Sequence, residues 1–268
     1  PVKDANGYYL DHSEIIQMEE GGRDVTQKDQ FYQQIQLVVE PLKDWLIHAE
    51  GNMKIVNNQN QWEVLPVYYH DGEGSPVAMA WFDGYTPGMS RVNQSYWKDN
   101  NYSLNLYTDY FKQIGDHYFK VIGGFNAELY KRTNLSGQRD ELITPDVPTL
   151  NTGTTEQKAN GGYSHWANAG FFGRINYNYK ERYLLEINGR YDGSSRFIGD
   201  KRWGFFPSFS AGWNVSREPF WRDLEHIVNN FKIRGSWGEL GNCNTTAFYP
   251  FYQTKPAGVE NNGWLING

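Results

Sequence analysis

The chain has 268 residues, of which 39% are apolar and 16% are aromatic. This aromatic content argues against a disordered chain, because disordered segments are poor in the residues that build a core. The formal net charge of -6 argues against nucleic acid as a partner. A single cysteine, Cys243, excludes a disulfide-stapled scaffold and a cysteine-rich metal site.

Apolar and polar residues alternate along most of the chain, which predicts β-strands because successive side chains of a strand point to opposite faces. We expect strands of about 10 to 14 residues, longer than the usual 5 or 6. Only residues 218–227 suggest a helix, with Pro219 suited to its first turn. In chain order, the alternating segments are residues 31–40, 45–55, 101–110, 119–129, 168–179, 183–192, 208–215 and 231–237.

The connections between these strands alternate in length. Long stretches rich in Gly, Asn, Thr and Pro lie near residues 56–95, 131–162 and 193–204. Short turns at one end and long loops at the other are typical of an outer-membrane barrel. The expected short turns are residues 41–44, 113–116 and 180–182.

The alternation alone fits two architectures. In a soluble sandwich or barrel the apolar face is the core, whereas in a transmembrane barrel it meets lipid and the polar face lines the lumen. Aromatic placement favours the second. Rings crowd the short-turn end of the strands and recur further along, and Phe171 to Tyr179 spans eight steps, roughly 26 Å at ~3.3 Å per residue. With a tilt near 40° this gives a height of about 20 Å, close to the ~25 Å apolar band between aromatic girdles.

We therefore predict an all-β, antiparallel transmembrane β-barrel with long extracellular loops and short periplasmic turns. Because unpaired strand edges are not tolerated in lipid, roughly ten spanning strands imply either a small closed barrel or part of a larger one. The chain begins Pro1-Val-Lys without an initiator methionine and stops in a strand or loop, so we expect part of a larger barrel.

The alternation also assigns residues to faces. Leu185 and Ile233 are expected in the middle of the apolar band. The predicted lumen-facing residues are Lys120, Glu128, Arg174, Glu186, Arg190 and Arg234. The predicted lipid-facing residues are Phe171, Ile175, Tyr177, Leu185, Ile187, Trp213 and Ile233.

Several aromatic residues lie in or near the long loops. Their rings are suited to stacking on the CH groups of sugars (compare) and equally to packing between loops. The candidate substrate contacts are Trp62, Tyr68, Trp81, Trp97 and Trp166.

We find no motif for catalysis, because the sequence lacks a nucleophile elbow, a phosphate loop and a paired-histidine zinc motif. We expect no enzymatic activity, cofactor or metal. Asp71-Gly-Glu-Gly and Asp99-Asn-Asn are taken as ordinary loop residues rather than cation sites. Asp192-Gly-Ser-Ser-Arg196 fits a ligand or lid contact, but we favour a turn fixed by Gly and by side-chain-to-backbone bonds from Asp and Ser.

Three phrases in the second half of the chain carry a family resemblance, supported by a run over residues 161–186. They are Arg190-Tyr-Asp-Gly-Ser-Ser-Arg-Phe, Lys201-Arg-Trp-Gly-Phe-Phe-Pro-Ser-Phe-Ser-Ala-Gly-Trp-Asn-Val and Lys232-Ile-Arg-Gly-Ser-Trp-Gly-Glu-Leu-Gly-Asn. In this order and spacing they resemble the barrel of SusC/RagA-type, TonB-linked outer-membrane proteins.

The resemblance implies a barrel of about 22 strands with an N-terminal plug in the bacterial outer membrane. It implies import of oligosaccharides or peptides, a SusD-like surface lipoprotein acting as a lid, and energy from the TonB complex. We expect residues 1–268 to be a partial barrel domain, with the plug and the TonB-contacting segment outside it. The charged lumen-facing residues would then contact the plug by ion pairs. Two alternatives are a soluble extracellular glycan-binding β module and a plain diffusion porin.

Overall fold

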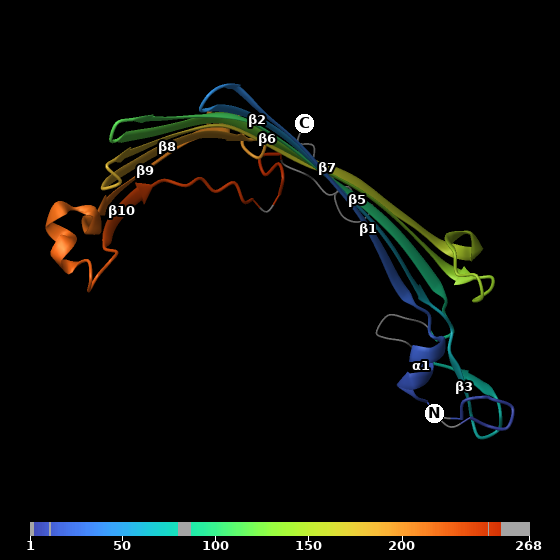
Figure 1. The fold of residues 1–268 in the computed structure, drawn as a ribbon. Coiled ribbons are helices and arrows are strands. Elements are labelled where there is room, and N and C mark those ends of the chain that lie inside the picture. The colour runs from blue at the N-terminus through green and yellow to red at the C-terminus, as the bar shows by residue number, and fades with distance from the viewer. Residues whose placement is uncertain (1–2, 11, 80–86, 246, 253–268) are drawn as a thin grey trace, which may run out of the picture. The chain divides into compact units, whose positions relative to one another are not determined.

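The computed structural model describes residues 3–10, 12–79, 87–245 and 247–252. Its main sheet has the strand order β1-β2-β5-β6-β7-β8-β9-β10, and a separate sheet pairs β3 with β4 (Figure 1). Neighbours along the chain are therefore neighbours in the main sheet, as in a barrel of hairpins. The strands of the main sheet are β1 (Asp24–Leu42), β2 (Trp45–Val64), β5 (Arg91–Ile114), β6 (His117–Leu142), β7 (Gly153–Tyr179), β8 (Tyr183–Ser194), β9 (Trp203–Asn214) and β10 (Lys232–Gly238).

The predicted all-β, antiparallel fold is confirmed, but the strand lengths and number differ from expectation. Strands β5, β6 and β7 have 24, 26 and 27 residues, about twice the expected length. The main sheet of the described residues has eight strands rather than roughly ten. Residues 56–64 and 131–142, expected in loops, belong to β2 and β6. Polar residues predominate in these extensions, so the period-two signal fades while the backbone ladder continues.

The three short turns are confirmed, and each contains a residue in the left-handed region. Asp44 has φ 69°, Gly115 has φ 57°, and Lys180 and Glu181 both have φ 54°. Positive φ is what the mirror-image turns of tight hairpins require, because their twist matches that of the strands.

Ion pairs connect these turns to neighbouring segments at the same end of the sheet. Lys112 Nζ lies 3.6 Å from Asp44 Oδ2, and Lys180 Nζ lies 3.3 Å from Asp116 Oδ2. Arg182 Nη1 lies 3.4 Å from Glu218 Oε2. Charges at the short-turn end of the sheet are thus largely paired with one another.

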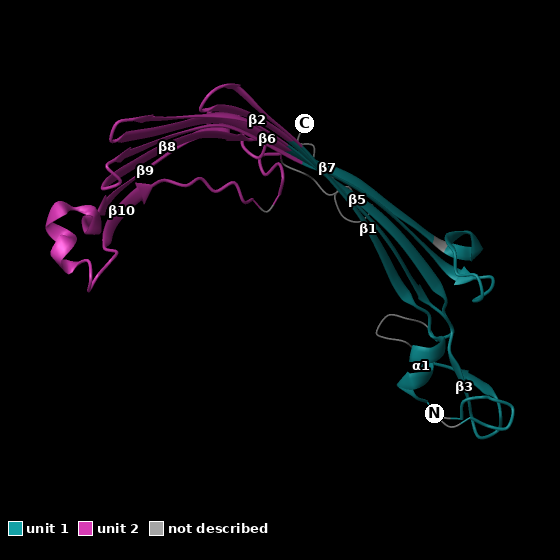
Figure 2. Ribbon diagram, in the orientation of Figure 1, with its two compact units in different colours: residues 1–35, 51–103, 129–165 teal, residues 36–50, 104–128, 166–268 magenta. Residues whose placement is uncertain are grey.

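The described chain divides into two compact units. Five long strands, β1, β2, β5, β6 and β7, contribute residues to both (Figure 2). Unit 1 contains residues 1–35, 51–103 and 129–165, and unit 2 contains residues 36–50, 104–128 and 166–268.

Unit 1 has a small apolar core beside the strand ends. Helix α1 (Glu14–Glu20) begins after Ser13, whose side chain accepts the Ile15 amide, and it buries Ile16. Strands β3 (Tyr68–His70) and β4 (Pro76–Ala78) form a hairpin beside it. The core residues are Tyr9, Ile16, Val67 and Met79, with Tyr69 packed against them. Helix α1 was not expected, because a helix of seven residues has only about two turns and is too short to show a 3.6-residue pattern.

Unit 2 contains two 3₁₀ segments between β9 and β10, namely η3 (Val215–Arg217) and η4 (Pro219–Leu224). The expected helix over residues 218–227 is therefore wrong in type and length, although Pro219 does occupy its first turn. The Trp221 amide donates to Glu218 O at 3.0 Å, the i to i+3 bond of a 3₁₀ turn. None of the helices among the described residues combines the length and apolar character needed to cross a membrane.

Candidate functional site: the two faces of the sheet

The strand register in unit 2 separates the side chains into an apolar and a polar face. Across β7 to β10, one row runs Ile175, Ile187, Phe209 and Trp237. The next row, displaced by one residue and therefore on the opposite face, runs Asn176, Glu186, Ser210 and Ser236.

The apolar face is uncovered in the described structure. Ile187 is 47% exposed and Phe171 is 55% exposed. Among the predicted lipid-facing residues, Tyr177 differs by being half-buried, because its ring lies 4.9 Å from that of Phe119 and its hydroxyl lies 2.8 Å from His117 Nδ1. The remaining members, all exposed, are Ile175, Leu185, Trp213 and Ile233.

The expected depth of Ile233 is wrong. Ile233 lies opposite Trp213, which in turn lies opposite Tyr183, the first residue of β8. Ile233 therefore belongs to the aromatic row at the short-turn end and not to mid-band. Sequence alone could not fix this register, because η3 and η4 separate β9 from β10 by a long connection.

Aromatic residues at the short-turn end of unit 2 have hydrogen-bond partners for their polar atoms. Trp45 Nε1 donates to Thr108 Oγ1 at 2.6 Å, and Trp213 Nε1 donates to Glu218 Oε1 at 3.0 Å. Rings with one apolar body and one satisfied polar end suit the boundary between an apolar layer and water.

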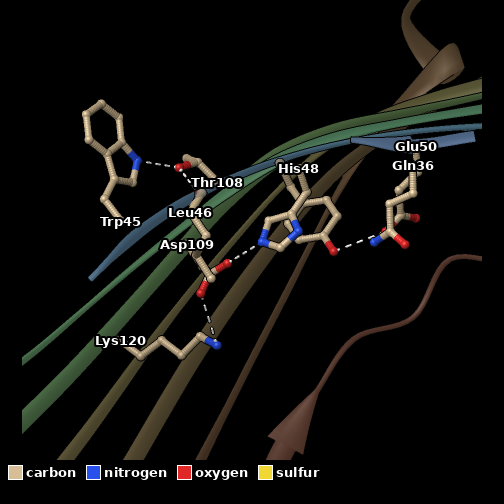
Figure 3. Close-up of polar contacts among 9 residues, drawn as sticks. Gln36, Trp45, Leu46, His48, Glu50, Thr108, Asp109 and Lys120 are labelled. Atoms are coloured by element: carbon tan, nitrogen blue, oxygen red, sulfur yellow. Dashed lines mark hydrogen bonds and ion pairs between the residues drawn. The ribbon is translucent and has the colours of Figure 1, made fainter. Parts of the chain in front are cut away.

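A charged network joins β2, β5 and β6 on the polar face of unit 2 (Figure 3). His48 Nε2 lies 2.8 Å from Asp109 Oδ1, and Lys120 Nζ lies 3.3 Å from Asp109 Oδ2. Asp109 is only 6% exposed, so these partners replace much of the water that its carboxylate loses.

Tyr107 and Gln36 extend the same network. The Tyr107 ring stacks on His48 with centroids 4.3 Å apart, and its hydroxyl donates to Glu50 Oε1 at 3.2 Å. Gln36 Nε2 also donates to Glu50 Oε1, at 3.2 Å (Figure 3). Four strands are thus cross-linked by side chains on the polar face.

A second polar cluster lies on β7 and β8. Arg174 Nε donates to Asn188 Oδ1 at 2.6 Å, and Asn188 Nδ2 donates to Glu186 Oε1 at 3.0 Å. These two bonds give a hydrogen-bond partner to the guanidinium of Arg174, to the amide of Asn188 and to the carboxylate of Glu186.

Arg190 and Asp192 form an ion pair of 2.9 Å on β8, and Arg190 Nη2 also donates to Asn126 Oδ1 on β6. The intervening strand carries Gly170 opposite Asp192. A Cβ at Gly170 would lie 1.9 Å from Asp192 Oδ1, so only glycine leaves room for this ion pair.

The six predicted lumen-facing residues all belong to these polar surfaces. Lys120 pairs with Asp109, and Arg174, Glu186 and Arg190 belong to the second cluster. Arg234 lines the same groove as Arg174 and Glu186. Glu128 lines a neighbouring cavity with Arg190.

Unit 1 carries further ion pairs on the strand extensions. Arg132 donates to both carboxylate oxygens of Asp99, at 2.6 and 2.7 Å, and Tyr130 donates to the same carboxylate at 3.0 Å. Asp99 and Arg132 lie on β5 and β6, each fifteen residues from the strand end at the Gly115 turn. At ~3.3 Å per residue this is roughly 50 Å along the strand, or a height of about 38 Å at a tilt near 40°, which is beyond an apolar band of ~25 Å.

The Arg132 guanidinium holds the pKa of Asp99 below its ordinary value, because its hydrogen bonds favour the ionised carboxyl. Burial raises the pKa of the Tyr130 hydroxyl, as does its hydrogen bond to Asp99. Asp99 was expected in a loop, and that expectation is wrong. Asp71 does act as a loop residue, since its Oδ1 accepts the amides of Glu73 and Ser75.

The candidate substrate contacts are dispersed over several elements. Trp62 and Trp97 lie half-buried on β2 and β5, and Tyr68 begins β3 with 42% of its surface exposed. Trp166 lies on β7, where the Arg196 guanidinium covers its ring at 5.2 Å. Trp81 lies outside the described residues.

The turn expected at Asp192–Arg196 is only partly as predicted, because Asp192, Gly193 and Ser194 belong to β8, while the serine bonds are those expected. The Arg196 amide donates to Ser194 Oγ at 3.3 Å, and Ser195 Oγ accepts the Ala167 amide at 2.9 Å. Asp192 differs, because its carboxylate pairs with Arg190 rather than with the turn.

Sequence reasoning missed His48, Tyr107 and Asp109 as a connected group. The period-two pattern places His48 and Asp109 on the polar face, but no local signal indicates that strands sixty residues apart align them. Within the described part of the chain, no three His, Cys, Asp or Glu side chains gather in a way that could hold a metal ion. The site is a polar wall of paired charges.

Comparison with known proteins identifies the family. The family model for the TonB dependent receptor-like β-barrel matches residues 5–267. The TonB-dependent receptor SusC of Bacteroides thetaiotaomicron is 34% identical over 158 residues, which are 57% of this chain and 15% of that protein. The TonB-dependent receptor P26 of Formosa agariphila is 31% identical over 237 residues, covering 84% of this chain and 21% of that protein.

Solved structures agree in fold. The structure of the RagAB peptide transporter aligns with a TM-score of 0.73 at 16% identity, covering 87% of this chain and 24% of that one. The chain therefore belongs to the TonB-dependent receptor β-barrel family, is of SusC/RagA type, and is a bacterial outer-membrane protein. It spans only 15–24% of the length of these relatives.

Proposed function

We propose that this chain forms part of the wall of a TonB-dependent importer of oligosaccharides. The observation that carries the proposal is the division of the unit 2 sheet into an uncovered apolar face and a polar face of interconnected charges. Membership of a family of receptors and transporters, rather than enzymes, supports a transport function.

The apolar face meets lipid. Ile187 and Phe209 stand opposite each other and are both about half exposed. In water such a face would form an apolar patch larger than soluble proteins usually tolerate. In a bilayer the same face is solvated by acyl chains, while the ladder satisfies the backbone groups.

The polar face meets the lumen, where a plug domain elsewhere in the protein packs against it. The groove lined by Arg174, Glu186, Arg234 and Ser236 offers charges of both signs and hydroxyl groups. A plug surface with complementary polar groups would satisfy them, since buried charge needs a partner. Residues 1–268 would then be a partial barrel domain.

Ligand capture takes place at the long-loop end, together with a SusD-like lipoprotein lid. Trp62, Tyr68 and Trp97 lie in unit 1 at this end, and their rings could stack on sugars (compare). These aromatic side chains are the reason to prefer a glycan as the ligand. Peptide is the competing ligand, because the structural neighbour RagAB is described as a peptide transporter.

The test compares growth of the source bacterium in two strains. In one the gene is deleted, and in the other the wild-type gene is restored to the deletion strain. We expect loss of growth on an oligosaccharide mixture, recovery with the wild-type gene, and no recovery when the TonB complex is absent. Growth that survives loss of TonB would indicate a diffusion porin, and a defect confined to peptide mixtures would replace the glycan with a peptide. Monodisperse protein in detergent-free buffer would instead favour the soluble glycan-binding module.

A further inference from the structure

A single arginine joins the turn that follows β8 to the segment that follows β10. The Arg196 guanidinium carbon lies 5.2 Å from the centre of the Trp166 ring and 5.0 Å from that of Phe248. Its Nη1 also donates to Thr245 Oγ1 at 3.2 Å. Arg196 is thus in contact with two rings and a hydroxyl, two of them contributed by the later segment.

This later segment, residues 239–245 and 247–252, is called the return segment here. Strand β10 ends at Gly238 opposite Ser208, so residues 203–207 of β9 have no partner in β10. The Glu239 amide donates to Pro207 O at 3.0 Å, and the chain then leaves the ladder.

The return segment crosses the polar face. Phe206 lies opposite Arg190 on that face, and a Cβ at Gly241 would lie 2.3 Å from the Phe206 ring. The backbone at Gly241 therefore passes directly over Phe206, an approach that only glycine permits.

The turn that carries Arg196 is firmly held. Ser195 donates its amide to Ala167 O at 2.8 Å and accepts the Ala167 amide on its Oγ at 2.9 Å. A Cβ at Gly193 would lie 2.6 Å from the Trp203 ring, so the backbone is packed against that indole. Arg196 thus projects from a fixed base toward a segment that has few ladder bonds of its own.

We propose that Arg196 is a positioning residue that fastens the return segment to the polar face of the sheet. Fastened there, the segment forms one wall of a cavity lined by Asn168, Arg190, Phe206, Asn242 and Cys243. In the importer this wall narrows the lumen at its long-loop end. The attachment itself does not depend on which ligand is carried or on whether transport occurs.

The test is hydrogen exchange, measured by mass spectrometry, on the full-length protein in detergent. Arg196→Ala removes two cation–π contacts and one hydrogen bond at a partly exposed site, which predicts about tenfold faster exchange of amides 239–245. Arg196→Lys keeps the charge but not the flat guanidinium, so we expect a smaller increase.

Arg202→Ala is the matched control, because Arg202 lies in the same loop and lines the same cavity, while its described hydrogen bond goes to Phe197 O and not to the return segment. Exchange of amides 239–245 should be unchanged in this variant. Unchanged exchange in assembled Arg196→Ala protein, or equal acceleration in Arg202→Ala, would overturn the proposal. Should Arg196→Ala fail to assemble, Phe248→Ala removes one ring contact from the other side and should give a smaller acceleration, and no change there would also overturn it.

Discussion

Arginine substitutions along the apolar face of β8 provide a depth-resolved test of which face meets lipid. Tyr183 and Tyr191 stand at the two ends of the face, and Ile187 lies midway between them. Leu185 lies halfway between Tyr183 and Ile187. If lipid covers this face, the cost of arginine should rise with distance from the aromatic rows.

The magnitudes follow from the strand geometry. Eight steps from Tyr183 to Tyr191 give roughly 26 Å along the strand and a height of about 20 Å at a tilt of ~40°. Ile187→Arg is therefore at the midplane and should cost ~3 kcal/mol, while Leu185→Arg, about 5 Å away, should cost ~2 kcal/mol. Ile233→Arg should cost ~1 kcal/mol or less, because the register pairs Ile233 with Trp213 in the aromatic row at the short-turn end.

The assay is denaturant unfolding of the full-length protein in lipid vesicles, read from the heat-modifiable shift in gel mobility. Leu184→Arg is the matched control, because it makes the same substitution one residue away on the opposite face. Leu184 lies opposite Gly212 and lines a groove with Lys232 and Arg234. We expect it to leave the unfolding free energy nearly unchanged.

Two results would refute the reasoning. Equal costs at Leu184 and Leu185 would mean that the two faces have the same surroundings. A cost at Ile233 as large as that at Ile187 would mean that the register does not report depth.

Two further predictions concern the polar side chains. Gly170→Ala should destabilise the protein by about 1–3 kcal/mol, because the added Cβ would lie 1.9 Å from Asp192 Oδ1; Gly173→Ala, whose Cβ meets only a carbonyl oxygen at 3.8 Å, is the control, and equal unfolding midpoints would contradict this. The pKa of Asp99 is lowered by Arg132, so its stabilising effect should be fully present above the unfolded pKa of ~3.9 and lost as the pH falls through the lower folded value. The stability difference between wild type and Asp99→Asn, measured from pH 7 to pH 3, should therefore shrink only at the acidic end, and a difference that disappears near neutral pH would count against this assignment.

The polar network on β2, β5 and β6 has a consequence for assembly. Asp109 accepts from both His48 and Lys120 while being almost fully buried. Each of the three groups lies on a different strand, so the network forms only after both hairpins have paired. Breaking a buried pair leaves one charge without a partner, which costs more than the pair contributes.

Sequence reasoning reached the fold class and the family because both depend on local information. Alternation depends only on the residues within one strand, because successive side chains point to opposite faces. Residues 168–192 show it clearly. The phrases from Arg190 to Asn242 identified the SusC/RagA resemblance without any knowledge of contacts.

The strand extensions escaped detection for a physical reason. Where polar residues predominate, as over residues 131–142, the backbone ladder persists but the side chains carry no periodic signal. The helical expectation at residues 218–227 failed because a 3₁₀ turn and an α-helix share the same first-turn proline signal.

Chain order, alternation and family were therefore determined by the sequence itself. Only the tertiary structure decided which residues meet across strands: that Ile233 stands beside Trp213, that Asp109 holds both His48 and Lys120, and that Arg196 reaches Phe248. The strand register and the course of the return segment are set by turns and by bulky side chains that are distant in the sequence. A local sequence pattern does not contain this information.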